Sequence, residues 1–348
     1  MSTAGGDNVT LTGDFFGPLL VPTSTGEVLS VDTVISATYS VISSSLNDAR
    51  LATSIFSAVS CKVTNAHIEI VCVTVAGVGS GLKWTVEVAS QTSGQGPGMA
   101  YAAPAVTSLS SGNFPGLSGF PTLGGDDITL TGTSFGPVDA TNEVAAYYSN
   151  PALSGLAGSQ YIANECVVNI ADTGIICKVA EGIGFDHKWS VVVGGQTSSE
   201  YLGQKMSYEV PSLAAISPKL LSTDGSTGIT LTGAQFGPES TSNVVTVMYR
   251  SVKYPNVGDV MTSNKMARNC SVDGHAHDTI TCVGSAEGIG TDLAFWVVVG
   301  TQTSNISTKK IAYKPPHVAS LTPVSGLETS GGDTVTIVGT NFGPAGIG

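Results

Sequence analysis

The stretch Val9-Thr10-Leu11-Thr12-Gly13, followed by Phe16-Gly17-Pro18, decides the fold because its pattern occurs four times. The intervals between the four motif phenylalanines are 119, 101 and 106 residues. A recurrence of about 100 residues is too long for a solenoid repeat and matches one β-sandwich domain. The chain is therefore an array of similar domains. The other copies are Ile128-Thr129-Leu130-Thr131-Gly132 with Phe135-Gly136-Pro137, Ile229-Thr230-Leu231-Thr232-Gly233 with Phe236-Gly237-Pro238, and Val335-Thr336-Ile337-Val338-Gly339 with Phe342-Gly343-Pro344.

Further landmarks follow the motif in one fixed order, which excludes chance as an explanation. A cysteine pair comes first, then a glycine turn, a tryptophan, a Gln-Thr-Ser triplet, and a tyrosine with a proline soon after it. These landmarks are Cys61/Cys72, Cys166/Cys177 and Cys270/Cys282; Gly77-Val78-Gly79, Gly182-Ile183-Gly184 and Gly288-Ile289-Gly290; Trp84, Trp189 and Trp296; Gln91-Thr92-Ser93, Gln196-Thr197-Ser198 and Gln302-Thr303-Ser304; and Tyr101, Tyr208 and Tyr313.

Composition limits the possible partners. Only 11% of the 348 residues are charged, and 14 Lys and Arg against 26 Asp and Glu give a net charge of −12. An acidic chain with scattered cations repels phosphate backbones, so we expect no nucleic-acid partner. No apolar run approaches the length of a membrane span, and the N-terminus lacks the basic and apolar features of a signal segment.

The six cysteines form three equally placed pairs. Ten or eleven residues separate the two partners, whereas zinc sites favour short Cys-x-x-Cys pairs with more Cys or His nearby. The spacing predicts disulfides and an oxidising compartment. Together with the absence of a signal segment, it predicts an excerpt of a longer secreted protein. The predicted bonds are Cys61–Cys72, Cys166–Cys177 and Cys270–Cys282.

Local patterns predict an all-β fold. In residues 8–12 the apolar side chains alternate with polar ones, which is the period of a half-buried strand. Glycine is abundant, at 43 residues, and the only candidate helix is a short one around Leu46 to Ser57. We expect tandem β-sandwiches, with the motif phenylalanines and the three tryptophans packed in their cores.

At this point the chain resembles the extracellular IPT/TIG family, immunoglobulin-like domains found in plexins and Met-type receptors. The family pattern of a proline-led first strand, a Gly-Gly turn, a Thr-rich strand and Gly-x-x-Phe-Gly is matched in residues 318–323, 331–337 and 339–343. The resemblance implies three full repeats and the start of a fourth. The repeats are expected at 1–103, lacking its first strand, at 104–210, at 211–315 and at 316–348.

Chemistry-bearing motifs are few, and we expect neither an enzyme nor a cofactor or metal. His275-Ala276-His277-Asp278 could present two imidazoles, but a solvated hairpin loop is the favoured interpretation. The Gly-Gly-Asp triplets are better explained as turns than as calcium ligands. Three sequons make Asn8, Asn269 and Asn305 candidate N-glycosylation sites, because a surface with so few charges needs another source of solubility. O-linked glycans on Ser or Thr are also compatible with the composition.

The resemblance and composition together predict an extracellular or cell-surface glycoprotein. The first interpretation is a structural protein that assembles head to tail, with itself as partner, into a filament or surface appendage. The alternative is a receptor or adhesin ectodomain that binds another surface protein or a carbohydrate. A hydrolase carrying accessory sandwiches would need a catalytic domain elsewhere. Two strands at residues 316–348 cannot bury their own apolar side chains, so the tail is expected to dock by strand addition or to continue into a longer array.

Overall fold

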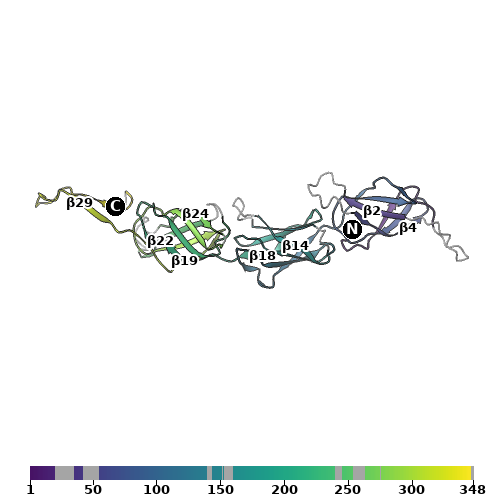
Figure 1. The fold of residues 1–348 in the computed structure, drawn as a ribbon, viewed down its shortest axis with the longest axis horizontal. Coiled ribbons are helices and arrows are strands. Elements are labelled where there is room, and N and C mark those ends of the chain that lie inside the picture. The colour runs from purple at the N-terminus through teal and green to yellow at the C-terminus, as the bar shows by residue number, and fades with distance from the viewer. Residues whose placement is uncertain are drawn as a thin grey trace.

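The computed structural model describes residues 1–19, 35–41, 55–138, 143–150, 152, 160–239, 245–253, 263–274 and 276–345. The regular elements within these ranges are β-strands, as the alternating patterns predict. Three sandwich repeats follow one another along a rod, and a two-stranded hairpin lies at the far end from the first repeat (Figure 1). None of the described residues belongs to a helix with the length and apolar character of a membrane span.

The first repeat contains two small sheets. Strands β1, β5 and β4 form one, and β3, β2, β6 and β7 form the other, with β8 on β6. Its strands are β1 (Asn8–Thr12), β2 (Ile35–Val41), β3 (Ile55–Ser57), β4 (Val59–Asn65), β5 (Glu69–Val73), β6 (Leu82–Val88), β7 (Gln91–Thr92) and β8 (Gly98–Met99).

The second repeat adds a strand in front of the motif strand. Its sheets run β14-β15-β11-β9 and β10-β18-β16-β12-β13, with β17 on β16. Its strands are β9 (Ala105–Ser110), β10 (Ser118–Phe120), β11 (Asp127–Thr133), β12 (Val144–Ser149), β13 (Gln160–Ile162), β14 (Asn164–Ile170), β15 (Gly174–Lys178), β16 (His187–Val193), β17 (Gln196–Thr197) and β18 (Tyr201–Tyr208).

The third repeat has the same plan, and the hairpin follows it. Sheets β19-β21-β25-β24 and β23-β22-β26-β27 enclose its core, β20 pairs with β28, and β29 pairs with β30. These strands are β19 (Ser212–Ser217), β20 (Leu220–Leu221), β21 (Ile229–Ala234), β22 (Val245–Ser251), β23 (Lys265–Met266), β24 (Arg268–Asp273), β25 (Thr279–Gly284), β26 (Leu293–Val299), β27 (Gln302–Thr303), β28 (Ala312–Tyr313), β29 (His317–Thr322) and β30 (Thr336–Thr340).

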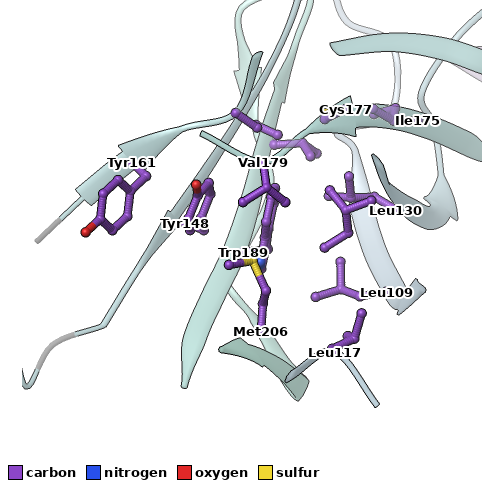
Figure 2. Packing of buried hydrophobic residues seen from close by; sticks show 14 of the residues in the cluster. Leu109, Leu117, Leu130, Tyr148, Tyr161, Ile175, Cys177, Val179, Trp189 and Met206 are labelled. Atoms are coloured by element: carbon purple, nitrogen blue, oxygen red, sulfur yellow. The ribbon is translucent and has the colours of Figure 1, made fainter. Parts of the chain in front are cut away.

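Each sandwich buries one aromatic and aliphatic core between its sheets. The motif phenylalanines of the second and third repeats are buried, at 0% exposure for Phe135 and 1% for Phe236, as the sequence predicts. Figure 2 shows Leu109 of β9 and Leu130 of β11 on one side of the second core, with Trp189 and Met206 beside them. The first strand of a repeat therefore contributes side chains to the core as well as backbone hydrogen bonds.

A pair of tyrosines closes each core and was not foreseen from the sequence. The closing tyrosine of each repeat hydrogen-bonds through its hydroxyl to a second tyrosine of the same repeat and donates to a carbonyl oxygen. In the second repeat the Tyr148 and Tyr208 hydroxyl oxygens are 2.6 Å apart, and Tyr208 Oη donates to Ala180 O at 2.8 Å. Burial raises the pKa of both tyrosines, so the hydroxyls stay protonated. The equivalent pairs are Tyr39–Tyr101 and Tyr249–Tyr313.

Two expectations about local structure are wrong. Trp296 is only half-buried and lies near the Arg250 guanidinium, while Phe295 stacks on Tyr249 with ring centroids 4.5 Å apart. A strand alternates its faces at every residue, so the one-residue offset turns Trp296 away from the core. The short helix predicted around Leu46 to Ser57 is also wrong in the part that the structure describes. Ile55–Ser57 forms β3 on β2, and residues 46–54 lie outside the described residues.

Candidate functional site at the repeat junctions

The junctions between repeats are the sites where unlike parts of the chain meet most specifically. At the first junction, Val78 from the glycine turn of the first repeat is 5% exposed and belongs to the core of the second repeat. Its methyl groups lie against Gly194, where a Cβ would come within 2.7 Å of Val78 Cγ2. The Gln196 Nε2 atom donates to the Tyr101 carbonyl oxygen at 3.1 Å. Thr3 Oγ1 donates to the Asp172 carboxylate.

The second junction uses the same positions. Ile183 replaces Val78, is 5% exposed and belongs to the core of the third repeat. A Cβ at Gly300 would come within 2.8 Å of Ile183 Cδ1, and Gln302 Nε2 donates to the Tyr208 carbonyl oxygen at 3.1 Å. Both junctions use equivalent residues. The aliphatic residue at the tip of the glycine turn, the glycine and the glutamine therefore form a specific interface between repeats. Neighbouring repeats interlock by placing a side chain of one in the core of the next.

Polar side chains surround the aliphatic tip at the second junction. His277 is 2% exposed, and its Nδ1 lies 2.9 Å from Thr122 Oγ1, while its Nε2 is 3.7 Å from a Glu181 carboxylate oxygen. Thr122 also donates its backbone N–H to Gln235 Oε1 at 2.8 Å, and Gln235 Nε2 donates to Glu209 at 2.7 Å. The predicted solvated loop around His277 is therefore wrong, because His277 is buried in an inter-repeat contact.

A second histidine supports the same junction from inside the second repeat. His187 is fully buried, and its Nε2 lies 3.0 Å from the carbonyl oxygen of Ile183, the residue at the tip. Since that oxygen only accepts, the neutral ring carries its proton on Nε2. Burial lowers the pKa of His187 to about 4, so the ring is uncharged at neutral pH. The equivalent positions in the other repeats are Leu82 and Leu293.

The counterparts of these junction residues at the two ends of the described rod are more exposed. Gln91, equivalent to Gln196 and Gln302, is exposed in the first repeat. Ile289, equivalent to Val78 and Ile183, is only half-buried in the third repeat. Phe15, beside the motif of the first repeat, is 90% exposed on the same end as the first-repeat hairpin turns. The first repeat keeps the junction glutamine but has Ala89 where the other repeats have Gly194 and Gly300.

The residues predicted as sites fall elsewhere. The three cysteine pairs are disulfide-bonded as Cys61–Cys72, Cys166–Cys177 and Cys270–Cys282. All three sequon asparagines are exposed. The Asn305 side chain in addition accepts from Leu213 N through Oδ1 at 2.9 Å and donates to Leu213 O through Nδ2. Among the described residues no group of three or more His, Cys, Asp or Glu side chains is placed to hold a metal ion. His275 lies outside the described residues.

Comparisons with known proteins find distant likenesses to solved structures. No protein family and no curated protein matches the sequence. The chain resembles the extracellular region of plexin A4 at TM-score 0.26 and 17% identity, over 94% of this chain and 25% of that one. It resembles surface glycan-binding protein PbSGBP-B from Prevotella bryantii at TM-score 0.34 and 14% identity, over 61% and 43% of the two chains. It also resembles invasin, a bacterial integrin-binding protein, at TM-score 0.22 and 15% identity, over 90% and 61%.

These structural likenesses support only limited conclusions about this chain. The chain spans 25% of the length of the plexin region that it matches. The neighbours are extracellular receptor, glycan-binding and integrin-binding proteins built from several domains. At such identities and scores they give no argument about what this chain binds, so the function has to come from its own junctions and surfaces.

Proposed function

We propose that this chain is a non-enzymatic, extracellular structural array whose IPT/TIG-like repeats assemble head to tail into a filament or surface appendage. The proposed repeats are residues 1–103, 104–210 and 211–315, with a fourth beginning at 316–348. The disulfides support an oxidising, extracellular location. Each complete repeat is too small to interlock with more than its two neighbours, so stacking is the natural mode of growth.

The observation that carries the proposal is the junction, which is built twice from equivalent residues. The equivalent positions at the two ends of the described rod are more exposed, since Ile289 is half-buried and Gln91 is exposed. A second copy placed end to end would bring Ile289 close to Ala89, whose Cβ the contact must accommodate where Gly194 and Gly300 have none, and would let Gln91 reach the Tyr313 carbonyl oxygen. Such a contact is heterologous, and a heterologous contact that does not close into a ring propagates as a filament.

Sedimentation velocity and negative-stain microscopy test the proposal. We expect the mass of the purified chain to rise with concentration in steps of 35.2 kDa and unbranched fibres to appear. Ile289→Asp should prevent growth because it would place an unpaired charge in a dry contact. Val283→Asp is the matched control, since Val283 is 70% exposed on the third repeat and away from the junction. A single 35.2 kDa species at every concentration would instead favour the receptor or adhesin alternative.

Glycans are proposed on Asn8 and Asn269, whose side chains are exposed. Asn305 is the weakest acceptor, because a glycan on its Nδ2 would break the hydrogen bond to Leu213 O. Glycopeptide mass analysis of protein from the native source should find Asn8 or Asn269 modified and Asn305 unmodified. Full occupancy of Asn305 would contradict the role of its amide in holding β19.

A further inference from the structure

The third repeat carries an apolar row on the outer face of one sheet. Met248 on β22 pairs with Met266 on β23 and, on its other side, with Trp296 on β26. The adjacent positions Val247 and Phe295 are fully buried, and strand side chains alternate, so the row faces away from the core. Met266 is 54% exposed, and the other two members are half-buried. A row of large apolar side chains in contact with water indicates a binding surface.

The fold does not require these side chains at these positions. The core-facing pairs Tyr148–Trp189 and Tyr249–Phe295 align the sheets of the second and third repeats. Ser190 therefore occupies the position of Trp296. In the first repeat the positions equivalent to the row and to Arg250 carry only hydroxyl side chains, which are Thr38, Ser40, Ser57 and Thr85. The apolar row is a property of the third repeat alone and not of the sandwich.

An arginine extends the row. Arg250 lies two residues beyond Met248 on the same face of β22 and is exposed. Its guanidinium carbon is 6.0 Å from the centroid of the Trp296 ring, which is the range of a cation–π contact. Among the described residues no carboxylate lies within salt-bridge distance of Arg250. Its N–H donors are therefore available to an anionic ligand.

A lysine lies on the other side of β26. Leu293 and Ile311 exchange two backbone hydrogen bonds and are both buried, so the next residue pair, Ala294 and Lys310, faces outward. Ala294 has Arg250 opposite it on β22, so one cation flanks β26 on each side. Lys310 is exposed, and in the part of the chain that the structure describes it also has no carboxylate within salt-bridge distance.

The distribution of charge favours an anionic ligand at this repeat. Residues 211–315 contain 8 Lys and Arg against 7 Asp and Glu, which gives a net charge of +1. Residues 104–210 contain 3 Lys and Arg against 10 Asp and Glu, which gives −7. An anion is therefore repelled by the rest of the chain and attracted to the face that carries Arg250 and Lys310.

The dimensions of the face favour a narrow ligand. β22 and β26 have seven residues each, or about 23 Å at about 3.3 Å per residue. The sheet β23-β22-β26-β27 has four strands about 4.8 Å apart. Its outer face therefore covers at most about 450 Å², against about 800 Å² per partner in a standard protein–protein interface. An extended polymer of small rings fits such a face better than a globular protein does.

We infer that this face binds an anionic polysaccharide, a chain of pyranose rings that bear carboxylate or sulfate groups. The C–H groups of a pyranose ring stack on the negative face of the Trp296 indole, and the two flexible methionines adapt to the neighbouring ring. Arg250 and Lys310 pair with the anionic groups. Ile289 and Gly300, the junction residues of this repeat, lie in turns outside β22 and β26, so the site is separate from the proposed head-to-tail contact.

Binding of polygalacturonate, dextran sulfate and neutral dextran to the full chain tests the site. We expect saturable, salt-sensitive binding of at least one anionic polymer and no binding of neutral dextran. Comparison of the two anionic polymers distinguishes carboxylate from sulfate. Trp296→Ser, which copies Ser190, and Arg250→Ser, which copies Ser149, should each weaken binding about tenfold. Both variants should keep the wild-type denaturation midpoint, because the two side chains point away from the core.

Two charge variants control for non-specific attraction. Lys178→Gln removes one positive charge from the second repeat and should bind as the wild type does. Asp292→Asn removes the carboxylate directly before β26 and should strengthen binding severalfold. Wild-type binding by Trp296→Ser, or equal losses in Lys178→Gln and Arg250→Ser, would overturn the site. Failure of both anionic polymers to bind would overturn it as well, including where an acidic protein binds instead. All of these outcomes leave head-to-tail assembly standing.

Discussion

Truncation of Ile183, the aliphatic residue at the second junction, is the sharpest test of how the repeats interlock. Ile183 is 5% exposed and packs in the core of the third repeat, although it belongs to the second. Ile183→Ala should destabilise the third repeat by about 2–4 kcal/mol, the range for removing a buried isoleucine side chain. At about 3 kcal/mol, the opening constant of the third repeat rises about a hundredfold.

Hydrogen exchange measured by mass spectrometry reads this effect in one repeat at a time, which matters because a multidomain chain does not unfold in one step. Peptides covering β21 and β25 should exchange faster in Ile183→Ala, while those covering β11 and β15 change little. The matched control is Ile289→Ala, at the equivalent turn tip but half-buried, which should cost less than about 1 kcal/mol in the isolated chain. Equal effects of the two substitutions, or faster exchange confined to the second repeat, would refute the interlocking junction.

Three further predictions concern the second repeat. Its free energy of unfolding should fall by up to about 3 kcal/mol as the pH drops from 6.5 to about 4, because His187 binds a proton in this range in the unfolded chain but not in the folded one. Denaturation measured across this range should show a weaker pH dependence for His187→Leu, which copies Leu82. A pH dependence equal to that of the wild type would refute the assignment. Tyr208→Phe should lower the denaturation midpoint by an amount equivalent to about 1–2 kcal/mol, since it removes the hydroxyl that donates to a carbonyl oxygen; a wild-type midpoint would contradict this. Replacing Cys166 and Cys177 together by alanine should cost about 2–3 kcal/mol in the same assay, and the difference from wild type should vanish under reducing conditions.

The sequence predicts the fold well because the signals for it are local. Alternation in residues such as 8–12 reports strand faces directly, and burial of Phe135 and Phe236 confirms the role of the repeated phenylalanine. Trp296 was misplaced because it lies 14 positions after Cys282, whereas Trp84 and Trp189 each lie 12 positions after their cysteine. Only the pairing of Phe295 with Tyr249 shows that Phe295, one residue before Trp296, faces the core. Because side chains in a strand alternate between its two faces, the sequence pattern alone does not reveal an offset of one residue.

The junctions could not be read in the same way, because their partners lie in different repeats. Gln196 and Gln302 look like ordinary turn residues, and their acceptor carbonyl oxygens are 95 and 94 residues away in sequence. One signal was available and unused: the centre of each glycine turn is aliphatic, with Val78 and Ile183 at the internal junctions. An apolar residue at the tip of an expected surface turn indicates a contact with something outside its own domain.

A cryo-electron microscopy map of assembled protein tests the central claim most directly, because it shows the contact between copies next to the contacts within one. The account predicts that the junction between copies superimposes on the two internal junctions. Ile289 would then lie close to Ala89, and Gln91 would reach the Tyr313 carbonyl oxygen. Fibres joined through other surfaces, or particles that remain single rods at every concentration, would contradict it.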